Sequence, residues 1–329
     1  MTVMNVRRLI PTATLAGAVS LGLVALSACS SSDAADKTSG DKLAVTASFY
    51  PMQFLAQRIG GDHVSVTTLT KPGVEPHDLE LKPRQAAELG EADVILYLKG
   101  IQPAVDEAIA QSGVRTVVDA ATLTTLEKHG TEVGHAHGGD EHAGEEHAGE
   151  EEAATDGRDP HIWLDPVRYA EVAKGVGAAL EKADPDNSAE YQKNTDTLVG
   201  QLGGLDTAFK QGLTDTATKT FITTHAAFGY LAERYGLEQE AIAGIDPEAE
   251  PSPARVRELE TIAEQDKVST VFFETLASDK TAKTIAADSG LKTDVLDPLE
   301  GITDKSKGDD YIEVMQSNLA ALRKALGAK

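Results

Sequence analysis

Residues 43–69 read LAVTASFYPMQFLAQRIGGDHVSVTTL, and this stretch decides the fold class. Its two apolar runs, 43–48 and 63–69, are short and rich in β-branched residues, which predicts strands. The segment near 51–60 between them predicts a helix. A strand, a helix and a second strand in this order provide the crossover that parallel strands need. The stretch therefore predicts an α/β protein with mainly parallel sheets and flanking helices.

The same alternation of apolar runs and helical segments continues along the chain. Ser252 and Pro253 predict the cap and the first residue of one helix, because a hydroxyl accepts from free amides and proline has no amide to satisfy. The last helix is expected from about 310 to 326, with Gly327 as its stop. Another helix is expected to start around Pro83. Further strands are expected at 93–98, 114–120, 220–224, 237–243, 268–273 and 291–296.

These elements divide the chain into two lobes that are joined by one long helix. Between the two sets of strands, residues 187–213 carry bulky apolar side chains at near-helical spacing. A continuous helix of this length would span about 40 Å, which is long enough to run along both lobes. We therefore expect an N-terminal lobe at 42–186, a linking helix at 187–213 and a C-terminal lobe at 214–329.

The N-terminal region predicts export and lipid anchoring. Residues 1–28 contain two arginines, then an apolar stretch and then small residues, which is typical of a signal peptide. The string LSAC at 26–29 resembles a bacterial lipobox, whose cysteine is acylated and becomes the mature N-terminus. We expect Cys29 to anchor the protein to the outer face of the cell membrane, with 29–41 as a polar tether. Cys29 is the only cysteine, which excludes an intramolecular disulfide and a cysteine-based zinc site.

The charge of the chain argues against one class of partner. The chain has 53 acidic and 30 basic residues, and its formal net charge is −23. Such a field repels phosphate backbones and attracts cations, so nucleic-acid binding is not expected. The 329 residues are 41% hydrophobic and 25% charged, which is a globular composition sufficient for two domains.

One internal segment differs in composition from both lobes. Residues 127–157 contain five histidines and ten acidic residues, and the pentad EHAGE occurs twice, at 141–145 and 146–150. With almost no bulky apolar side chains the segment cannot fold alone, and we interpret it as a disordered, mobile loop. Two interpretations of this segment are open. Its histidines bind zinc weakly, or the segment is only a solvated spacer. The histidines concerned are His129, His135, His137, His142 and His147.

Three of the remaining histidines have informative surroundings. His77 lies in the loop KPGVEPHDLELKP, His161 in the proline-bounded turn DPHIWLDP, and His225 directly after the apolar run of FITTHAAFGYL. Each is expected beyond the carboxyl end of a strand or in a rigid turn, where open α/β folds place ligand sites. The three imidazoles are therefore candidates to converge on one point. His63, at the start of a strand, is expected only to form a hydrogen bond.

Four motifs, in chain order, carry a resemblance to a known family. EPHDLELKP, DPHIWLDP, THAAFGYL and LDPLEGI resemble motifs of the zinc-specific solute-binding lipoproteins of bacterial ABC importers, of the high-affinity zinc-uptake type (cluster A-I). The resemblance covers 42–329 and implies a metal bound in the cleft between the two lobes. It implies nitrogen ligands at His77, His161 and His225. The fourth ligand is expected at Glu300, with Asp297 second and water as a further alternative.

The same resemblance, together with the ligand types, favours zinc over manganese. Manganese-binding relatives place a carboxylate where His225 stands, and imidazoles suit tetrahedral Zn²⁺. Glu75 and Glu274 are expected next to the ligands or on the surface rather than as ligands. Asp159, Asp165 and Asp78 flank the histidines and are candidates to accept imidazole N–H groups. Helix capping is the alternative, and it is favoured for Asp165.

The resemblance implies a receptor that captures Zn²⁺ and delivers it to an ABC permease with its ATPase. We expect a monomer that is not an enzyme. A manganese or iron receptor of the same family is the alternative. A zinc hydrolase is less favoured, because the sequence has no His-Glu-x-x-His helix, nucleophile elbow or phosphate-binding glycine loop. A surface adhesin is also less favoured, because the four motifs concentrate on one site.

Overall fold

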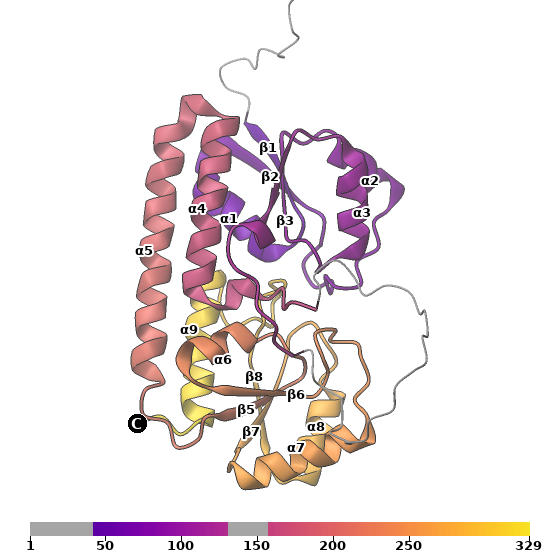
Figure 1. Cartoon of the computed structure of the whole chain (residues 1–329), viewed down its shortest axis with the longest axis vertical. Helices are drawn as coiled ribbons and strands as arrows, with labels where there is room; N and C mark the ends of the chain where they lie inside the picture. Colours follow the sequence, from indigo (N-terminus) through magenta and orange to yellow (C-terminus); the bar gives the residue numbers. More distant parts are fainter. Residues whose placement is uncertain (1–41, 131–156) are drawn as a thin grey trace, which may run out of the picture. The chain divides into compact units, whose positions relative to one another are not determined.

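The computed structural model describes residues 42–130 and 157–329 as two α/β lobes, each with a four-stranded parallel sheet (Figure 1). The expected fold class is confirmed. Other predictions fall outside the described residues. They concern the signal peptide 1–28, the tether 29–41, Cys29, His135, His137, His142 and His147.

The N-terminal sheet has the spatial order β2-β1-β3-β4, with every neighbouring pair parallel. Its strands are β1 (Leu43–Ala47), β2 (Val64–Thr68), β3 (Val94–Tyr97) and β4 (Thr116–Asp119). One side carries α1 and the other α2 and α3, as Figure 1 shows. These helices are α1 (Tyr50–Gly60), α2 (Pro83–Leu89) and α3 (Pro103–Ser112).

The C-terminal sheet repeats this topology, with the order β6-β5-β7-β8 and all pairs parallel. Its strands are β5 (Thr220–Thr223), β6 (Glu238–Ala241), β7 (Thr270–Phe273) and β8 (Lys292–Val295). Its helices are α6 (Gly229–Tyr235), α7 (Pro253–Gln265), α8 (Lys280–Asp288) and α9 (Tyr311–Ala325). All eight strands fall within the ranges expected from the sequence.

The burial of each strand follows from its position in its sheet. All four residues of the central strand β5 are buried, as are the first three of β3 and β7. A central strand of a parallel sheet is covered on both faces by helices, so it reads as a continuous apolar run. The edge strand β2 instead alternates between less and more exposed residues, and β8 has no fully buried residue.

The linking helix predicted at 187–213 is α5 (Ser188–Gly212), which is continuous. A second long helix, α4 (Pro166–Ala183), lies beside it in Figure 1 and packs against it. The two helices approach closely at Gly177, where a Cβ atom would stand 2.3 Å from the Thr195 hydroxyl oxygen. Helix α5 also packs against α1 and α9, so it contacts both lobes.

The predicted helix ends are confirmed where their caps can be checked. Ser252 accepts a hydrogen bond from the Arg255 amide at 3.1 Å, and α7 begins at Pro253. Asp310 caps α9, and Gly327 stands just beyond that helix with a φ of +66°, which favours glycine. Among the helices of the described ranges, none combines the length and apolar character that crossing a membrane requires.

One hydrophobic core continues from the N-terminal lobe through α4 and α5 into the C-terminal lobe. Trp163 lies at its centre with no exposed surface, and its ring meets that of Phe49 edge to face at 5.1 Å. The indole N–H donates to the Pro298 carbonyl at 2.7 Å. The Tyr311 hydroxyl donates to the Trp163 carbonyl at 2.5 Å. Trp163 therefore ties the segment before α4 to the C-terminal lobe.

Candidate metal centre

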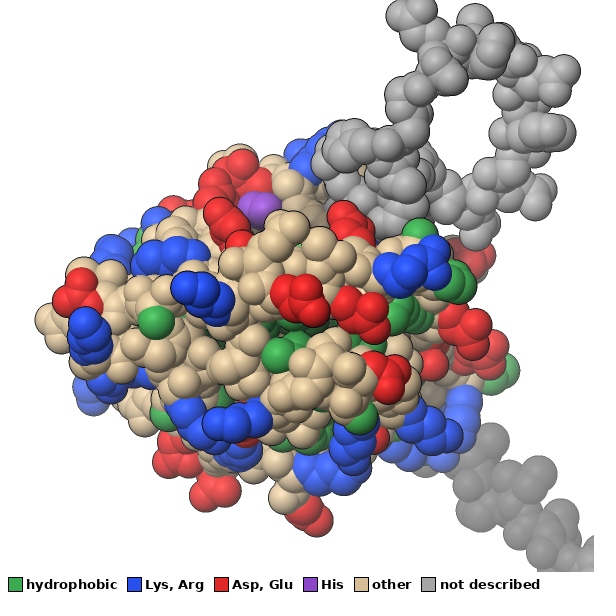
Figure 2. All heavy atoms as spheres, turned by 90° about the horizontal axis from the view of Figure 1, so that it is seen from below, with side chains coloured by type: hydrophobic (Ala, Val, Ile, Leu, Met, Phe, Trp, Pro, Cys, Tyr) green, Lys and Arg blue, Asp and Glu red, His purple; other side chains and the backbone are tan. Residues whose placement is uncertain are grey.

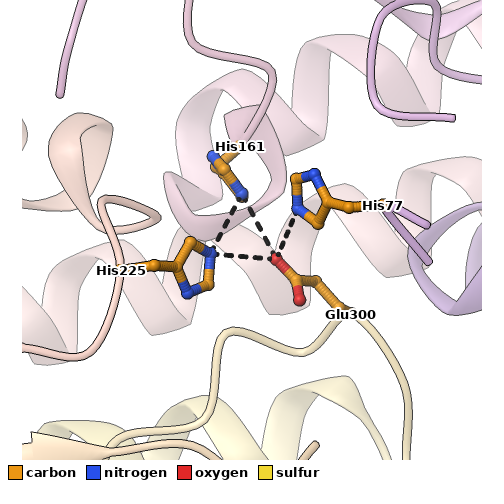
Figure 3. Close-up of side chains that lie close together, drawn as sticks. All are labelled: His77, His161, His225 and Glu300. Atoms are coloured by element: carbon orange, nitrogen blue, oxygen red, sulfur yellow. Dashed lines mark hydrogen bonds and ion pairs between the residues drawn. The ribbon is translucent and has the colours of Figure 1, made fainter. Parts of the chain in front are cut away.

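Four side chains that are far apart in the sequence meet between the lobes (Figure 3). His225 stands two residues after β5, and His77 lies in the loop that follows β2. His161 lies in the turn that leads into α4, and Glu300 in the segment after β8. Strands of a parallel sheet end at one edge, so the loops after them converge there. The predicted convergence of three imidazoles is what this geometry shows.

The spacing of the four ligand atoms suits a tetrahedral ion. The Nε2 atoms of His77, His161 and His225 lie 3.3, 3.2 and 3.2 Å from one oxygen of Glu300, Oε1. The Nε2 atoms of His161 and His225 are 3.4 Å apart. A tetrahedron with zinc–nitrogen bonds of about 2.0–2.1 Å has edges of about 3.3 Å. All four atoms lie within 4.8 Å of one another.

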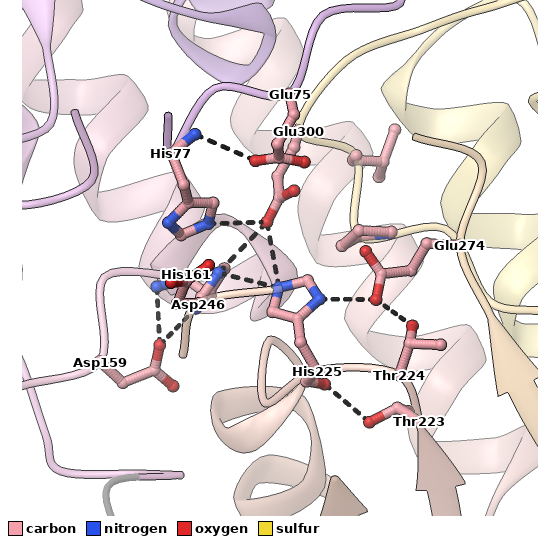
Figure 4. A network of polar contacts seen from close by, with 12 residues as sticks. Glu75, His77, Asp159, His161, Thr223, Thr224, His225, Asp246, Glu274 and Glu300 are labelled. Carbon is pink, nitrogen blue, oxygen red and sulfur yellow. Dashed lines mark hydrogen bonds and ion pairs between the residues drawn. The ribbon is translucent and has the colours of Figure 1, made fainter. Parts of the chain in front are cut away.

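Two of the imidazoles are oriented by a carboxylate on the far side of the ring (Figure 4). Nδ1 of His161 is 2.7 Å from Asp159 Oδ1, and Nδ1 of His225 is 2.6 Å from Glu274 Oε1. A proton held on Nδ1 by a carboxylate leaves the Nε2 lone pair free for a metal ion. Asp159 is thus confirmed as the acceptor of an imidazole N–H, and Glu274 lies beside a predicted ligand.

The carboxylates around His161 and His225 favour the charged form of both rings. Burial disfavours charge on His161 and His225, but the carboxylates outweigh it. The pKa of His161 is therefore raised, and the pKa of His225 lies well above its ordinary value. Burial also opposes ionisation of Glu300, but the imidazoles, His225 foremost, bring the pKa of its carboxyl well below the usual range. The electrostatics of this site favour a positive charge next to an ionised carboxylate.

The buried carboxylate of Glu300 is only partly paired by hydrogen bonds. Glu300 is completely buried, and among the residues that the structure describes its second oxygen, Oε2, has no hydrogen-bond partner. Buried carboxylate oxygens are normally paired because losing hydration without compensation is unfavourable. The three Nε2 atoms around Oε1 give the nitrogen and anionic oxygen donors that a divalent cation binds, so the residues present fit one. His77 keeps 10% of its side chain exposed, whereas the side chains of His161, His225 and Glu300 have no exposed surface.

Asp297, the second candidate for the fourth ligand, lies outside the cluster. Its Oδ1 accepts from the Leu299 amide at 2.9 Å, and its Oδ2 accepts from the Ser306 hydroxyl at 2.8 Å. Leu299 has a positive φ of 59°, which turns the chain between the two acidic residues. Of the two, the structure brings Glu300 to the imidazoles and uses Asp297 to hold the turn.

The other acidic candidates have separate roles. Asp165 caps α4 by accepting from the Val167 amide and pairs with Arg234 at 2.6 Å, so the capping alternative is confirmed. Asp78 is exposed. Glu75 accepts from the His77 amide at 3.0 Å. Burial and the neighbouring Glu300 carboxylate raise the pKa of Glu75 to about 9, so it is neutral near pH 7.

His63 lies away from the metal centre, as expected from its place at the start of a strand. Its Nε2 is 2.9 Å from a carboxylate oxygen of Glu190, and 30% of the His63 side chain is exposed. The contact therefore lies at the surface, where such pairs contribute little to stability.

Two residues that contact Glu274 and Asp159, which orient the imidazoles, were not predicted from the sequence. The hydroxyl of Thr224 donates to the same Glu274 oxygen that contacts His225. The hydroxyl of Tyr230 donates to the Asp159 carbonyl at 2.8 Å. Thr224 directly precedes His225, so a role near this ligand could have been predicted from its position. The role of Tyr230 could not be predicted from the sequence, because it depends on the packing of α6 against the turn before α4.

The start of the segment expected to be mobile is held in place. The Glu127 amide donates to the Tyr230 hydroxyl, and the Glu127 carbonyl accepts from the Asp159 amide, both at 2.8 Å. The ring of His129 stands perpendicular to that of Tyr230, with centroids 4.5 Å apart. Residues 127–130 are thus part of the folded lobe, because tyrosine and backbone partners compensate for a composition that has almost no apolar side chains.

The fold has two α/β lobes with parallel sheets, and three imidazoles and a buried carboxylate meet between the lobes. This arrangement defines a metal-binding protein of the solute-receptor class. The family model described as zinc-uptake complex component A, periplasmic (ZnuA), matches residues 45–325. The chain belongs to this family. The membership expected from the four motifs is therefore confirmed.

The chain is similar to proteins named for zinc. The high-affinity zinc uptake system protein ZnuA of Bacillus subtilis is 37% identical over 313 residues, covering 93% of this chain and 95% of that protein. The zinc-binding lipoprotein AdcA of Streptococcus pneumoniae is 35% identical over 92% of this chain, which spans only 59% of AdcA. The crystal structure of the Zn(II)-bound ZnuA-like domain of AdcA matches with a TM-score of 0.70 at 32% identity, covering 87% of this chain and 99% of that domain.

A further solved relative bears on the adhesin alternative. The laminin-binding protein Lmb of Streptococcus agalactiae, described as bifunctional with adhesin and metal transporting activity, matches with a TM-score of 0.73 at 28% identity. The match covers 87% of this chain and all of Lmb. In Lmb, adhesin and metal transporting activity are thus joined in one protein of this fold.

Proposed function

We propose that this protein is an extracytoplasmic receptor that captures Zn²⁺ between its lobes and delivers it to a membrane permease. The single observation that carries the proposal is the cluster of His77, His161, His225 and Glu300, in which four of the six distances between ligand atoms are 3.2–3.4 Å, as in a tetrahedral zinc site. Membership of the zinc-uptake family and the zinc-binding relatives support it.

The ligand set favours zinc over manganese, and the relatives named for zinc favour it over iron. Three neutral imidazoles and one carboxylate suit a tetrahedral Zn²⁺ ion, whereas Mn²⁺ prefers more oxygen ligands and higher coordination. The orienting contacts of Asp159 and Glu274 raise the basicity of two of these imidazoles, which strengthens them as zinc ligands. A manganese or iron receptor is therefore not proposed.

We assign no catalytic role to the centre. A catalytic zinc site keeps one position open for water, whereas four protein ligands close the coordination sphere. Three of these ligands have no exposed surface, which leaves no route for a bulky substrate to the ion. Capture and release of the ion are the chemistry that this arrangement supports.

Delivery and location complete the proposal. The family model describes a component of a zinc-uptake complex, so the partner is proposed to be an ABC permease with its ATPase. The protein is proposed to act as a monomer, held to the outer face of the cell membrane by acylated Cys29. Growth of cells that express the protein with radioactive palmitate, followed by purification and detection of the label, tests the anchor, with Cys29→Ser as the unlabelled control.

Metal content of protein purified without added metal tests the function. We expect about one tightly held zinc per chain in the wild type and in Asp297→Asn, because Asp297 holds a turn. Glu300→Gln removes the anionic ligand and is expected to lose most of that zinc under the same washing. Elemental analysis measures both variants. Equal zinc in all three proteins, or another metal in the wild type, would contradict the proposal.

Zinc affinity is expected to fall as the pH is lowered, beginning above the ordinary histidine pKa of about 6.5. Binding needs neutral imidazoles, and the raised pKa values of His161 and His225 keep protons on these rings at higher pH. The Glu300 carboxylate stays ionised throughout, because its pKa is lowered. Competition with a chelator of known affinity, from about pH 8 to about pH 5, measures the dependence. A flat profile would count against these ligands.

A further inference from the structure

His129, at the start of the His-rich segment, reaches the carboxylate that orients a metal ligand. Its Nδ1 is 3.2 Å from Asp159 Oδ2. The other oxygen of that carboxylate, Oδ1, is 2.7 Å from Nδ1 of His161. One carboxylate therefore joins His129 to His161, whose Nε2 faces Glu300 at 3.2 Å.

The Asp159 carboxylate needs both of these donors. Its side chain has no exposed surface, and Oδ1 also accepts from the His161 amide at 2.9 Å. A buried carboxylate oxygen without a donor is unfavourable, because its lost hydration is not compensated. Without His129, Oδ2 would lose its donor, and the carboxylate would rotate toward another partner or admit water. The donor on Oδ2 thus fixes the direction in which Oδ1 points.

The position of His129 is itself fixed by contacts that involve no metal. Its ring packs on Tyr230, whose hydroxyl donates to the Asp159 carbonyl and accepts from the Glu127 amide. The Asp159 amide donates to the Glu127 carbonyl at 2.8 Å. The backbone on both sides of the contact is therefore anchored, and His129 is presented to Asp159 in one orientation.

Gly229, the first residue of α6, leaves the space that His129 occupies. A Cβ atom at this position would lie 2.3 Å from Cβ of His129 and 3.0 Å from Oδ2 of Asp159. Alanine is compatible with a helix and has a higher helix propensity than glycine. A methyl group at 229 would therefore move His129 off Asp159 without opposing the helix.

We propose that His129 is a positioning residue for the metal centre, acting through Asp159 on the orientation of His161. The inference rests on the proposed function, because its effect is measured as zinc binding. It differs from the weak loop-ligand role suggested by the sequence. Both ring nitrogens of His129 already lie within 3.3 Å of carboxylates, Nδ1 beside Asp159 and Nε2 beside Glu233.

The test compares substitutions that remove or retain the donor. His129→Phe keeps a ring without a nitrogen, whereas His129→Asn keeps an N–H donor close to the position of Nδ1. Changing groups that orient zinc ligands typically weakens binding about 10- to 100-fold. We expect about 10-fold weaker binding and faster zinc release for His129→Phe, and recovery of most of the loss in His129→Asn. Competition with a tight chelator, which strips weakly bound zinc, gives the affinity, and stopped-flow mixing gives the release rate.

Two further variants separate positioning from a general loss of structure. Gly229→Ala, whose methyl group would meet both His129 and Asp159 Oδ2, is expected to weaken zinc binding at least as much as His129→Phe. The double variant is expected to add little to Gly229→Ala, because both changes disrupt the contact between His129 and Asp159. Glu233→Gln is the matched control. It alters the 55% exposed partner on the other side of the His129 ring and is expected to bind zinc like the wild type.

In NMR spectra of the zinc-loaded protein, the Nδ1–H resonance of His161 is expected to move in His129→Phe but not in Glu233→Gln.

The outcomes distinguish the inference from the function on which it rests. A wild-type chain that holds no zinc overturns both. Tight zinc binding by the wild type, with an unchanged affinity, release rate and His161 resonance in His129→Phe and Gly229→Ala, overturns the positioning role alone. Loss of weak binding only, with the tight site intact, also overturns it. If His129→Phe fails to fold, Gly229→Ala and His129→Asn decide the matter by the same measurements.

Discussion

Replacing His225 by alanine is expected to weaken zinc binding by about 100- to 1,000-fold. Structural zinc sites with four ligands have apparent binding free energies of about 10–16 kcal/mol, so one ligand accounts for about 3–4 kcal/mol. Each 1.4 kcal/mol corresponds to about tenfold in affinity. His225 is completely buried and its Nε2 lies 3.2 Å from Glu300, so its replacement by alanine removes a nitrogen from the centre of the cluster.

The matched control for this prediction is His63→Ala. His63 is also an imidazole paired with a carboxylate, but its partner Glu190 lies at the surface, away from the cluster. The control is expected to bind zinc like the wild type in the same chelator competition. Circular dichroism of both variants checks that they are folded. A loss of less than about tenfold in His225→Ala would show that His225 is not a ligand.

Replacing Trp163 by alanine is expected to lower the free energy of unfolding by about 3–5 kcal/mol. Deleting a large aromatic side chain from a packed interior has this effect because a cavity remains. Trp163 has no exposed surface and packs on Phe49. Its loss would also leave the Pro298 carbonyl without the indole N–H. Because the side chain joins the two lobes, we expect the loss to affect both together.

Chemical denaturation of the metal-free protein, followed by circular dichroism, measures this effect. Fluorescence is unsuitable for the alanine variant, because Trp163 is the only tryptophan. Trp163→Phe retains most of the buried aromatic area and is expected to be less destabilised. A loss below about 1 kcal/mol in Trp163→Ala, or two separate unfolding transitions in the wild type, would contradict a core shared by the lobes.

The shared core and the helix α5 bear on how the ion is exchanged. Helix α5 contacts both lobes, and buried hydrogen bonds from Trp163 and Tyr311 cross the same region. Large hinge closure would have to disrupt these contacts. His77 is the one ligand with exposed surface, and it lies in a loop outside the regular strands and helices. The expected exchange route therefore passes His77, with small local movements.

Much of the fold could be predicted from local sequence patterns. The central strands are continuous apolar runs, because a parallel sheet is covered on both faces, and every described strand fell within its expected range. Ser252 and Gly327 marked helix ends through the hydrogen-bonding and backbone preferences of their residue types. The packing of α4 beside α5 was not anticipated, because its close approach at Gly177 depends on side chains of another helix.

The sequence by itself determined the residue types of the metal centre, because three histidines in four ordered motifs restrict the chemistry to nitrogen ligands with a nearby carboxylate. It placed Glu300 ahead of Asp297 as the fourth ligand but kept Asp297 as an alternative, since two acidic residues three positions apart have similar local surroundings. Only the tertiary structure separated them, by pairing Asp297 with Ser306 and turning Glu300 toward the imidazoles. The link from His129 through Asp159 to His161 was likewise decided by folding, because hydrogen bonds between distant segments leave no local pattern.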